Sequence, residues 1–232
     1  MPMTFNSTYL LVLAGALLCM IASGYLKSTY ARYTKIQSGS GLTGKEVAER
    51  LLYSQGIFDV TVEHTAGNLT DHYDPRKKRI CLSDATYGST SVAAVGVAAH
   101  ECGHACQHHK GYALLGLRSA LVPAANLGAK IAWPLIIIGL LFNNRSSIIF
   151  LNIGIVAFSL AVLFQIVTLP VEFDASNRAL KMLGSSGILT AEEVPLSRKV
   201  LTAAALTYVA GAASSVLQLL RLILLSNGRR RN

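Results

Sequence analysis

Charged side chains are scarce in this 232-residue chain, and acidic side chains are scarcer than basic ones. Only 14% of the residues are Asp, Glu, Lys or Arg, whereas about a quarter is usual in soluble domains. Hydrophobic residues make up 52% of the chain. This composition excludes an ordinary soluble domain, because much of the surface must face something other than water.

Cysteine is also sparse, and its placement excludes a disulfide framework. Secreted disulfide domains are short and space their cysteines between loops. Here Cys19 lies in an apolar run, and Cys102 and Cys106 lie one turn apart on an expected helix. No Cys-x-x-Cys pair occurs. Small buried thiols in a reducing compartment are the better interpretation, with cysteine ligation of zinc as the alternative.

The chain lacks a basic face of the kind that binds nucleic acid. Its net charge is +9, but the basic residues gather at the ends of apolar segments and do not alternate with aromatics. The three groups are 27–35, 76–79 and 229–231. Such flanks suit the anionic head groups of a lipid bilayer, so we expect a membrane partner and no nucleic acid.

Long apolar runs are what the chain has in place of charge. Thr8–Leu26 is long enough to cross about 30 Å of hydrocarbon. Basic residues follow this run and none precedes it, which predicts an uncleaved anchor with its N-terminus outside. Ile131–Phe142 and Ile148–Leu169 are joined by the short polar link 143–147 and predict a transmembrane hairpin, with a kink at Pro134.

A fourth apolar run, Leu201–Leu225, is interrupted by Gln218 and Arg221. If this run crossed the membrane, the basic residues 229–231 would lie outside, against the positive-inside rule. Crossing the bilayer and packing at its face therefore both stay open.

The polar stretches predict a small folded part with short elements. Thr43 and Glu46 have the spacing of a capping box, which predicts a helix that ends at Gly56. The other expected elements are strands at Val60–Glu63 and Arg79–Ser83, a polar turn at Leu69–Pro75, and helices at Ser89–His109 and Glu172–Leu183, the last stopped by Gly184.

The expected helix at Ser89–His109 carries the sequence HECGH at residues 100–104. Residues four apart share a helix face, so His100 and His104 can bind one metal ion. A catalytic zinc site needs three protein ligands and an open position for water, from which Glu101 can take a proton. Gly103 would let another element approach closely. A chance match in this length is on the order of 1% or less, so we expect one zinc ion per chain and a zinc metallopeptidase.

The third ligand must come from elsewhere, and two residues compete for the role. His108 shares a helix with the first two ligands and would have to bend round to the same metal, so we expect His108 and His109 to be supporting or surface groups. Glu172 is better placed, because it opens a helix as the chain returns to the cytoplasm. The alternative is that Glu172 only caps the N-terminus of that helix.

Three segments carry a resemblance to a known family: Leu69–Pro75, Ala98–Ala105 and Pro170–Ala175. They resemble the bacterial YugP-type neutral zinc metallopeptidases, and the likeness covers most of the chain. The layout is more distantly similar to HtpX-type membrane gluzincins. The resemblance implies zinc ligands His100, His104 and Glu172, with Glu101 as general base. It also implies protein or peptide substrates at the cytoplasmic face of a multi-pass protein in the bacterial plasma membrane.

One position departs from the gluzincin pattern. Those proteins place an Asp four residues after the ligand glutamate, where it steadies a ligand histidine, and here that residue is Ser176, with Asp174 nearby. Either Ser176 or another group must orient the histidine. The candidates for oxyanion stabilisation are His72, Arg178 and Tyr208. The strand Ile80–Ser83 is either an edge that accepts extended substrate or a covered strand.

The expected fold is a mainly α integral membrane protein with a small α+β zincin-like catalytic domain. Its expected parts are a transmembrane anchor at 1–28, the zincin-like part at 29–120, the hairpin at 121–170, the helix with the third ligand at 171–200, and an apolar helix with a basic tail at 201–232. Two rival functions are a zinc-stabilised membrane scaffold without turnover and a site-2-type intramembrane protease. The run Val92–Ala99 is apolar enough for the latter, but no Leu-Asp-Gly tripeptide occurs.

Overall fold

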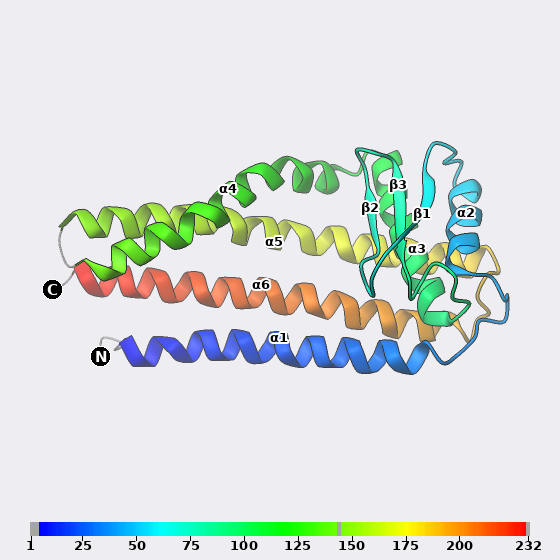
Figure 1. The fold of residues 1–232 in the computed structure, drawn as a ribbon, viewed down its shortest axis with the longest axis horizontal. Coiled ribbons are helices and arrows are strands. Elements are labelled where there is room, and N and C mark those ends of the chain that lie inside the picture. Colours follow the sequence, from blue (N-terminus) through cyan, green and yellow to red (C-terminus); the bar gives the residue numbers. More distant parts are fainter. Residues whose placement is uncertain (1–4, 143–144, 231–232) are drawn as a thin grey trace. The chain divides into compact units, whose positions relative to one another are not determined.

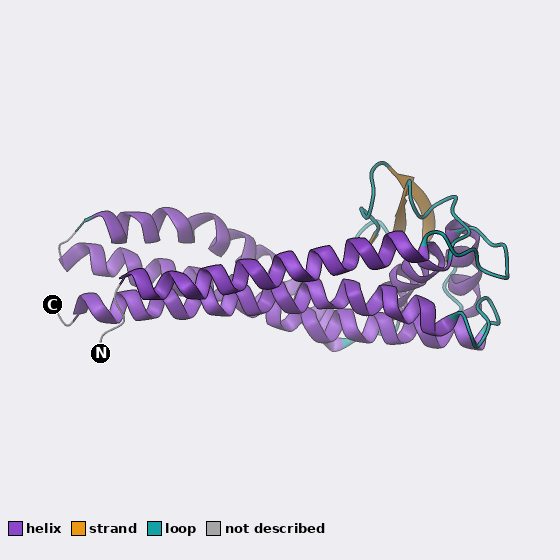
Figure 2. Cartoon of the chain, turned by 90° about the horizontal axis from the view of Figure 1, so that it is seen from below, coloured by secondary structure: helices purple, strands orange, loops and turns teal. Residues whose placement is uncertain are grey.

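The computed structural model describes residues 5–142 and 145–230 and is mainly helical (Figures 1 and 2). The described elements are α1 (Phe5–Tyr33), α2 (Gly44–Ser54), β1 (Thr61–Thr65), β2 (His72–Asp74), β3 (Arg79–Ser83), α3 (Val92–His109), α4 (Ala113–Leu141), α5 (Arg145–Ser185) and α6 (Val194–Arg230). This confirms the expectation of a mainly α protein with a few short strands, which here form one small sheet.

The chain divides into two compact units, and four helices contribute to both. The helical unit comprises residues 1–23, 117–169 and 207–232. The mixed unit comprises residues 24–116 and 170–206, and it contains α2, the sheet and α3.

Among the described residues, four helices are long and apolar enough to cross a membrane. These candidate spans are Thr8–Tyr33, Ala113–Leu141, Ser147–Ser185 and Val194–Gly228. A helix of 41 residues such as α5 is about 60 Å long, roughly twice the hydrocarbon thickness. A single helix can therefore cross the bilayer and still extend well beyond it.

The continuity of α5 corrects the prediction that a new helix opens at Glu172. Pro170 lies inside α5, which runs unbroken to Ser185. A proline removes one helical hydrogen bond, but Val171 and Ala175 are fully buried, and tertiary packing overrides that local cost. Glu172 therefore caps no helix. The polar link expected at 143–147 also ends earlier than predicted, because α5 already begins at Arg145. Residues 143 and 144 lie outside the described residues.

Small residues let α4 and α5 pack closely within the helical unit. A Cβ placed on Gly128 would lie 2.4 Å from the carbonyl oxygen of Ala157, and one on Gly139 would lie 2.7 Å from Leu151. Close approach through small residues is a common way for helices to associate in lipid. Pro123 and Pro134, the expected site of a kink, both lie inside α4. This helix begins at Ala113, well before the apolar run expected to start at Ile131.

The sheet has the strand order β1-β3-β2, with β3 parallel to β1 and antiparallel to β2. The predicted strand at Arg79–Ser83 is confirmed, and the first strand shifts to Thr61–Thr65. The idea that β3 is an edge is wrong, because both of its sides are paired. The polar turn expected at Leu69–Pro75 is partly wrong too, since His72–Asp74 forms β2, an outer strand whose polar residues hid its character.

A hydrophobic core joins α2, the sheet, α3 and the end of α5 in the mixed unit. The capping box is confirmed: the backbone N–H of Thr43 donates to the Glu46 carboxylate at 2.8 Å, and the N–H of Glu46 donates to the Thr43 hydroxyl at 3.3 Å. All four cysteines are free, as expected, and Cys81, Cys102 and Cys106 are buried.

Candidate metal centre

The helix α3, which carries His100 and His104, lies in close contact with α5 and α6 in the mixed unit. α3 begins after Ser91, whose hydroxyl accepts from the Ala94 backbone N–H at 3.2 Å. A Cβ on Gly96 would lie 2.6 Å from the Ser197 hydroxyl, and one on Gly103 would lie 2.4 Å from the carbonyl oxygen of Ala175. The expectation that Gly103 admits a neighbouring element is confirmed, and that element is α5.

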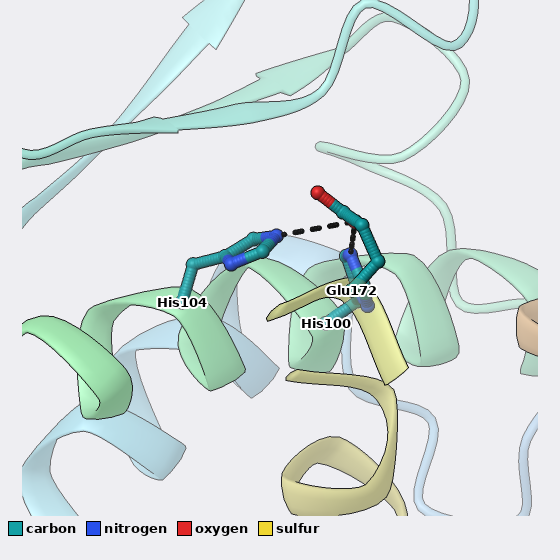
Figure 3. Close-up of side chains that lie close together, drawn as sticks. All are labelled: His100, His104 and Glu172. Atoms are coloured by element: carbon teal, nitrogen blue, oxygen red, sulfur yellow. Dashed lines mark hydrogen bonds and ion pairs between the residues drawn. The ribbon is translucent and has the colours of Figure 1, made fainter. Parts of the chain in front are cut away.

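This close approach brings three potential ligands together. Donor atoms of His100, His104 and Glu172 all lie within 4.8 Å of one another. The Nε2 atoms of His100 and His104 lie 3.2 Å and 3.5 Å from Glu172 Oε2, and the three side chains point toward one another from α3 and α5 (Figure 3). Glu172 is buried, with 3% of its side chain exposed.

His108, the competing candidate, lies elsewhere. Its Nδ1 is 2.8 Å from the hydroxyl of Tyr73 on β2. A pocket of about 250 Å³ is lined by both residues together with His109, Asp59 and Lys78. His108 is therefore part of a separate polar cluster, while Glu172 lies with His100 and His104.

The chemistry of the three side chains fits zinc. Two imidazole nitrogens and one carboxylate oxygen are a donor set found in catalytic zinc sites, which leave one position for water or substrate. A carboxylate buried to this degree also requires positive charge or hydrogen-bond donors beside it. Burial lowers the pKa of His104, but Glu172 and the charge of Glu101 outweigh that effect and raise the pKa overall.

Glu101 follows the first histidine and is itself 6% exposed. Burial raises the pKa of its carboxyl group, whereas the charges of His100 and His104 act to lower it. The net pKa is above its ordinary value. A carboxylate with a raised pKa beside the potential ligands is suited to accept a proton near neutral pH.

Each histidine has a partner on its Nδ1 side. His100 Nδ1 lies 3.1 Å from the Ser176 hydroxyl, and His104 Nδ1 lies 3.0 Å from Gln107 Oε1. Asp174 contacts neither ring. It accepts hydrogen bonds from Gln107 Nε2 at 2.8 Å and from Arg178 Nε at 2.6 Å.

Sequence reasoning missed Gln107, although one signal was available. Gln107 lies three residues after His104, a spacing that places two side chains on the same helix face. The sequence does not show that Asp174, 67 residues away, lies within hydrogen-bonding distance of Gln107.

The three oxyanion candidates occupy different places. His72 is exposed at the start of β2, with its Nδ1 2.9 Å from the carbonyl oxygen of Thr70. Arg178 is paired with Asp174 and lies over the ring of Tyr112. Tyr208 belongs to the helical unit, where it lines a pocket with Gln165 and others.

Comparison with known proteins gives two matches. A family model described as "Putative neutral zinc metallopeptidase" matches residues 8–227. The chain is also similar to the "Putative membrane protease YugP" of Bacillus subtilis (strain 168), with 44% identity over 208 residues that cover 89% of this chain and 91% of that protein. No solved structure matches.

Proposed function

The chain belongs to the neutral zinc metallopeptidase family, and we propose that it is a membrane-bound endopeptidase that hydrolyses protein substrates with one zinc ion. The observation that carries the proposal is the cluster of His100, His104 and Glu172 on two helices, with the buried Glu101 beside it. His100, His104 and Glu172 are the proposed ligands.

Within this site the zinc ion, when bound, supplies a Lewis acid and lowers the pKa of water toward about 7. Glu101 accepts the proton of the attacking water and returns it to the leaving amine, because a carboxylate with a raised pKa can act in both directions. Glu172 and the two imidazoles keep the donor atoms fixed in a largely buried setting.

Because β3 is central, we assign substrate binding to an outer strand, and of the two outer strands we choose β2, which directly follows Asp71. β2 pairs with β3 on one side only, and extended peptides add to such free edges by β-augmentation. Asp71, directly before β2, accepts hydrogen bonds from the backbone N–H and the hydroxyl of Ser83, and its charge contributes to the raised pKa of Glu101. We therefore propose that an extended substrate along β2 passes near Glu101.

The proposed location of the site is the cytoplasmic face of the membrane. Lys27, Arg32 and Lys35 lie at and after the C-terminal end of α1, and cytoplasmic flanks carry such an excess of basic residues. The site residues lie in the chain segments that follow α1 and the apolar part of α5.

Two observations favour this function over its rivals. A structural zinc site is closed by four ligands, whereas three side chains cluster here and Glu101 stands beside them. An intramembrane protease would carry its histidines on a spanning helix. Over residues 5–142 and 145–230, the candidate spans are parts of α1, α4, α5 and α6, and α3 is not among them.

Replacing Glu101 by Gln tests the proposal. We expect Glu101→Gln to retain about one zinc per chain, because Glu101 is not among the proposed ligands. Hydrolysis of an unfolded protein that carries a fluorescent label should fall by about 10²- to 10⁴-fold. The matched control is Glu192→Gln, at an exposed position, which should retain full activity. Unchanged hydrolysis in Glu101→Gln would rule out the proposed base, and zinc retained after loss of both histidines would rule out the ligands.

A further inference from the structure

Gln107 is a polar side chain with no exposure at all, one turn beyond His104 on α3. A buried amide without partners is costly, so its hydrogen bonds must be made inside the protein. Three of them are present, and together they determine which way the amide faces.

The nitrogen of the amide has two partners that can only accept. Gln107 Nε2 donates to the backbone carbonyl of Val171 and to Asp174 Oδ2, both at 2.8 Å. Reversing the amide would place its oxygen against two other oxygens. Oε1 must therefore be the atom that faces His104 Nδ1 at 3.0 Å.

This orientation also determines which nitrogen of His104 carries the proton. An amide oxygen accepts only, so Nδ1 must be the donor, and the lone pair of the neutral ring is then on Nε2. Nε2 is the atom that faces Glu172. We propose that Gln107 is a positioning residue that holds His104 in its metal-binding tautomer, an inference that rests on the proposed zinc site.

The close contact between α3 and α5 explains why Gln107 is so well placed. The helices meet where Gly103 touches Ala175. One turn forward on α3 is Gln107 and one turn back on α5 is Val171, so the helices run antiparallel at this point. A backbone carbonyl held in a packed helix is a fixed acceptor, and it fixes the amide in turn.

Asp174 adds charge to this arrangement from one step further away. Its carboxylate accepts from Gln107 and also pairs with Arg178 at 2.6 Å. Arg178 in turn lies 5.7 Å from the centre of the Tyr112 ring. The carboxylate thus acts on His104 through the Gln107 amide.

His100 lacks such a constraint. Its partner Ser176 has a hydroxyl that can either donate or accept, so this contact is compatible with both tautomers. The effect of Gln107 should therefore be specific to His104.

The test is zinc affinity, measured by competition with a chromogenic chelator. Gln107→Leu removes the acceptor of the His104 proton and should weaken zinc binding by about 10- to 100-fold, the usual effect of losing such a partner. Gln107→Glu keeps the shape but sets a carboxylate against Val171 and Asp174, and it should be weakened similarly. Gln55→Leu, at the end of α2, is the matched control and should bind zinc normally.

A double variant separates positioning from mere packing. In Gln107→Glu with Asp174→Asn, the new amide can donate to the new carboxylate, so zinc affinity should recover in part relative to Gln107→Glu alone. Absorption of the cobalt-substituted protein should recover with it, because it reports the ligand geometry. Thermal unfolding of the metal-free variants shows whether each one folds.

The outcomes distinguish the two proposals. If His104→Ala abolishes zinc binding while Gln107→Leu and Gln107→Glu bind as tightly as the wild type, the positioning role is overturned and the metal site stands. A double variant that binds no better than Gln107→Glu would overturn the role of Asp174 as the partner. If the wild-type protein binds no zinc at all, the proposed function itself fails.

Discussion

His100 and His104 differ in the residue that contacts the Nδ1 atom of each ring. His100 has 15% of its side chain exposed, and its Nδ1 partner is the Ser176 hydroxyl. Behind His104 lies Gln107, which has no exposure. Water can replace a lost hydroxyl at the first ring, but it has no room to replace the amide at the second.

Replacing Ser176 by Ala should therefore have a mild effect. One neutral hydrogen bond contributes about 1 kcal/mol, which corresponds to about a fivefold loss of zinc affinity. This is smaller than the loss expected for Gln107→Leu, and chelator competition can measure both. Ser185→Ala is the control, because its hydroxyl donates to the Met182 carbonyl within the same helix. A loss in Ser176→Ala that equals or exceeds that in Gln107→Leu would contradict this ranking.

The sequence predicts well which side chains lie together on one helix. It predicts poorly which side chains meet across two helices. The spacing of His100 and His104 implies a shared face, since helix geometry alone dictates it. The partnership of Gln107 with Asp174 depends on how α3 and α5 cross, and no local pattern encodes that crossing.

Among the elements, α3 and α5 depend on one glycine for their close contact. A Cβ on Gly103 would lie 2.4 Å from the Ala175 carbonyl oxygen and 3.1 Å from its Cα, both backbone atoms that cannot rotate away. The helices would have to separate, and the separation would act on the cluster because its proposed ligands come from both helices.

Gly103→Ala should therefore lower the free energy of unfolding by about 1–3 kcal/mol, the usual cost of overpacking, and should weaken zinc binding as well. Circular dichroism during thermal unfolding in detergent measures the first effect. Gly116→Ala, in α4 with open space around its Cβ, is the control and should be neutral or slightly stabilising. Equal stability of Gly103→Ala and wild type would show that the contact is not tight.

The elements that could be predicted are those whose ends are determined locally. The capping box of α2 and the strand at Arg79–Ser83 follow from nearby side chains. β2 was missed because an outer strand of three largely polar residues resembles a turn. The passage of α5 through Pro170 was missed because the packing that sustains it, around Val171 and Ala175, comes from distant parts of the chain.

Across the molecule, contacts within the helical unit indicate the course of α6. Arg221 lies 4.3 Å from the centre of the Tyr9 ring, and the Ser226 hydroxyl donates to Asn152 at 2.8 Å. Tyr9 is near the start of α1 and Asn152 near the start of α5. The final turns of α6 thus lie beside the first turns of two other candidate spans. In a bilayer that all three helices cross, these turns would lie at the same side.

These contacts lead us to expect that α6 crosses the membrane, despite the basic residues at 229–231. The contacts of the last turns of α6 with α1 and α5 are the reason for this expectation, which departs from the positive-inside rule. In a Cys19→Ser background, we expect Ser146→Cys and Asn232→Cys to react with a membrane-impermeant maleimide in intact cells. Glu192→Cys, on the segment with the site, should react only after permeabilisation and is the internal control. Labelling of residue 232 only after permeabilisation would show that α6 stays at the cytoplasmic face, and the same result for residue 146 would overturn the hairpin.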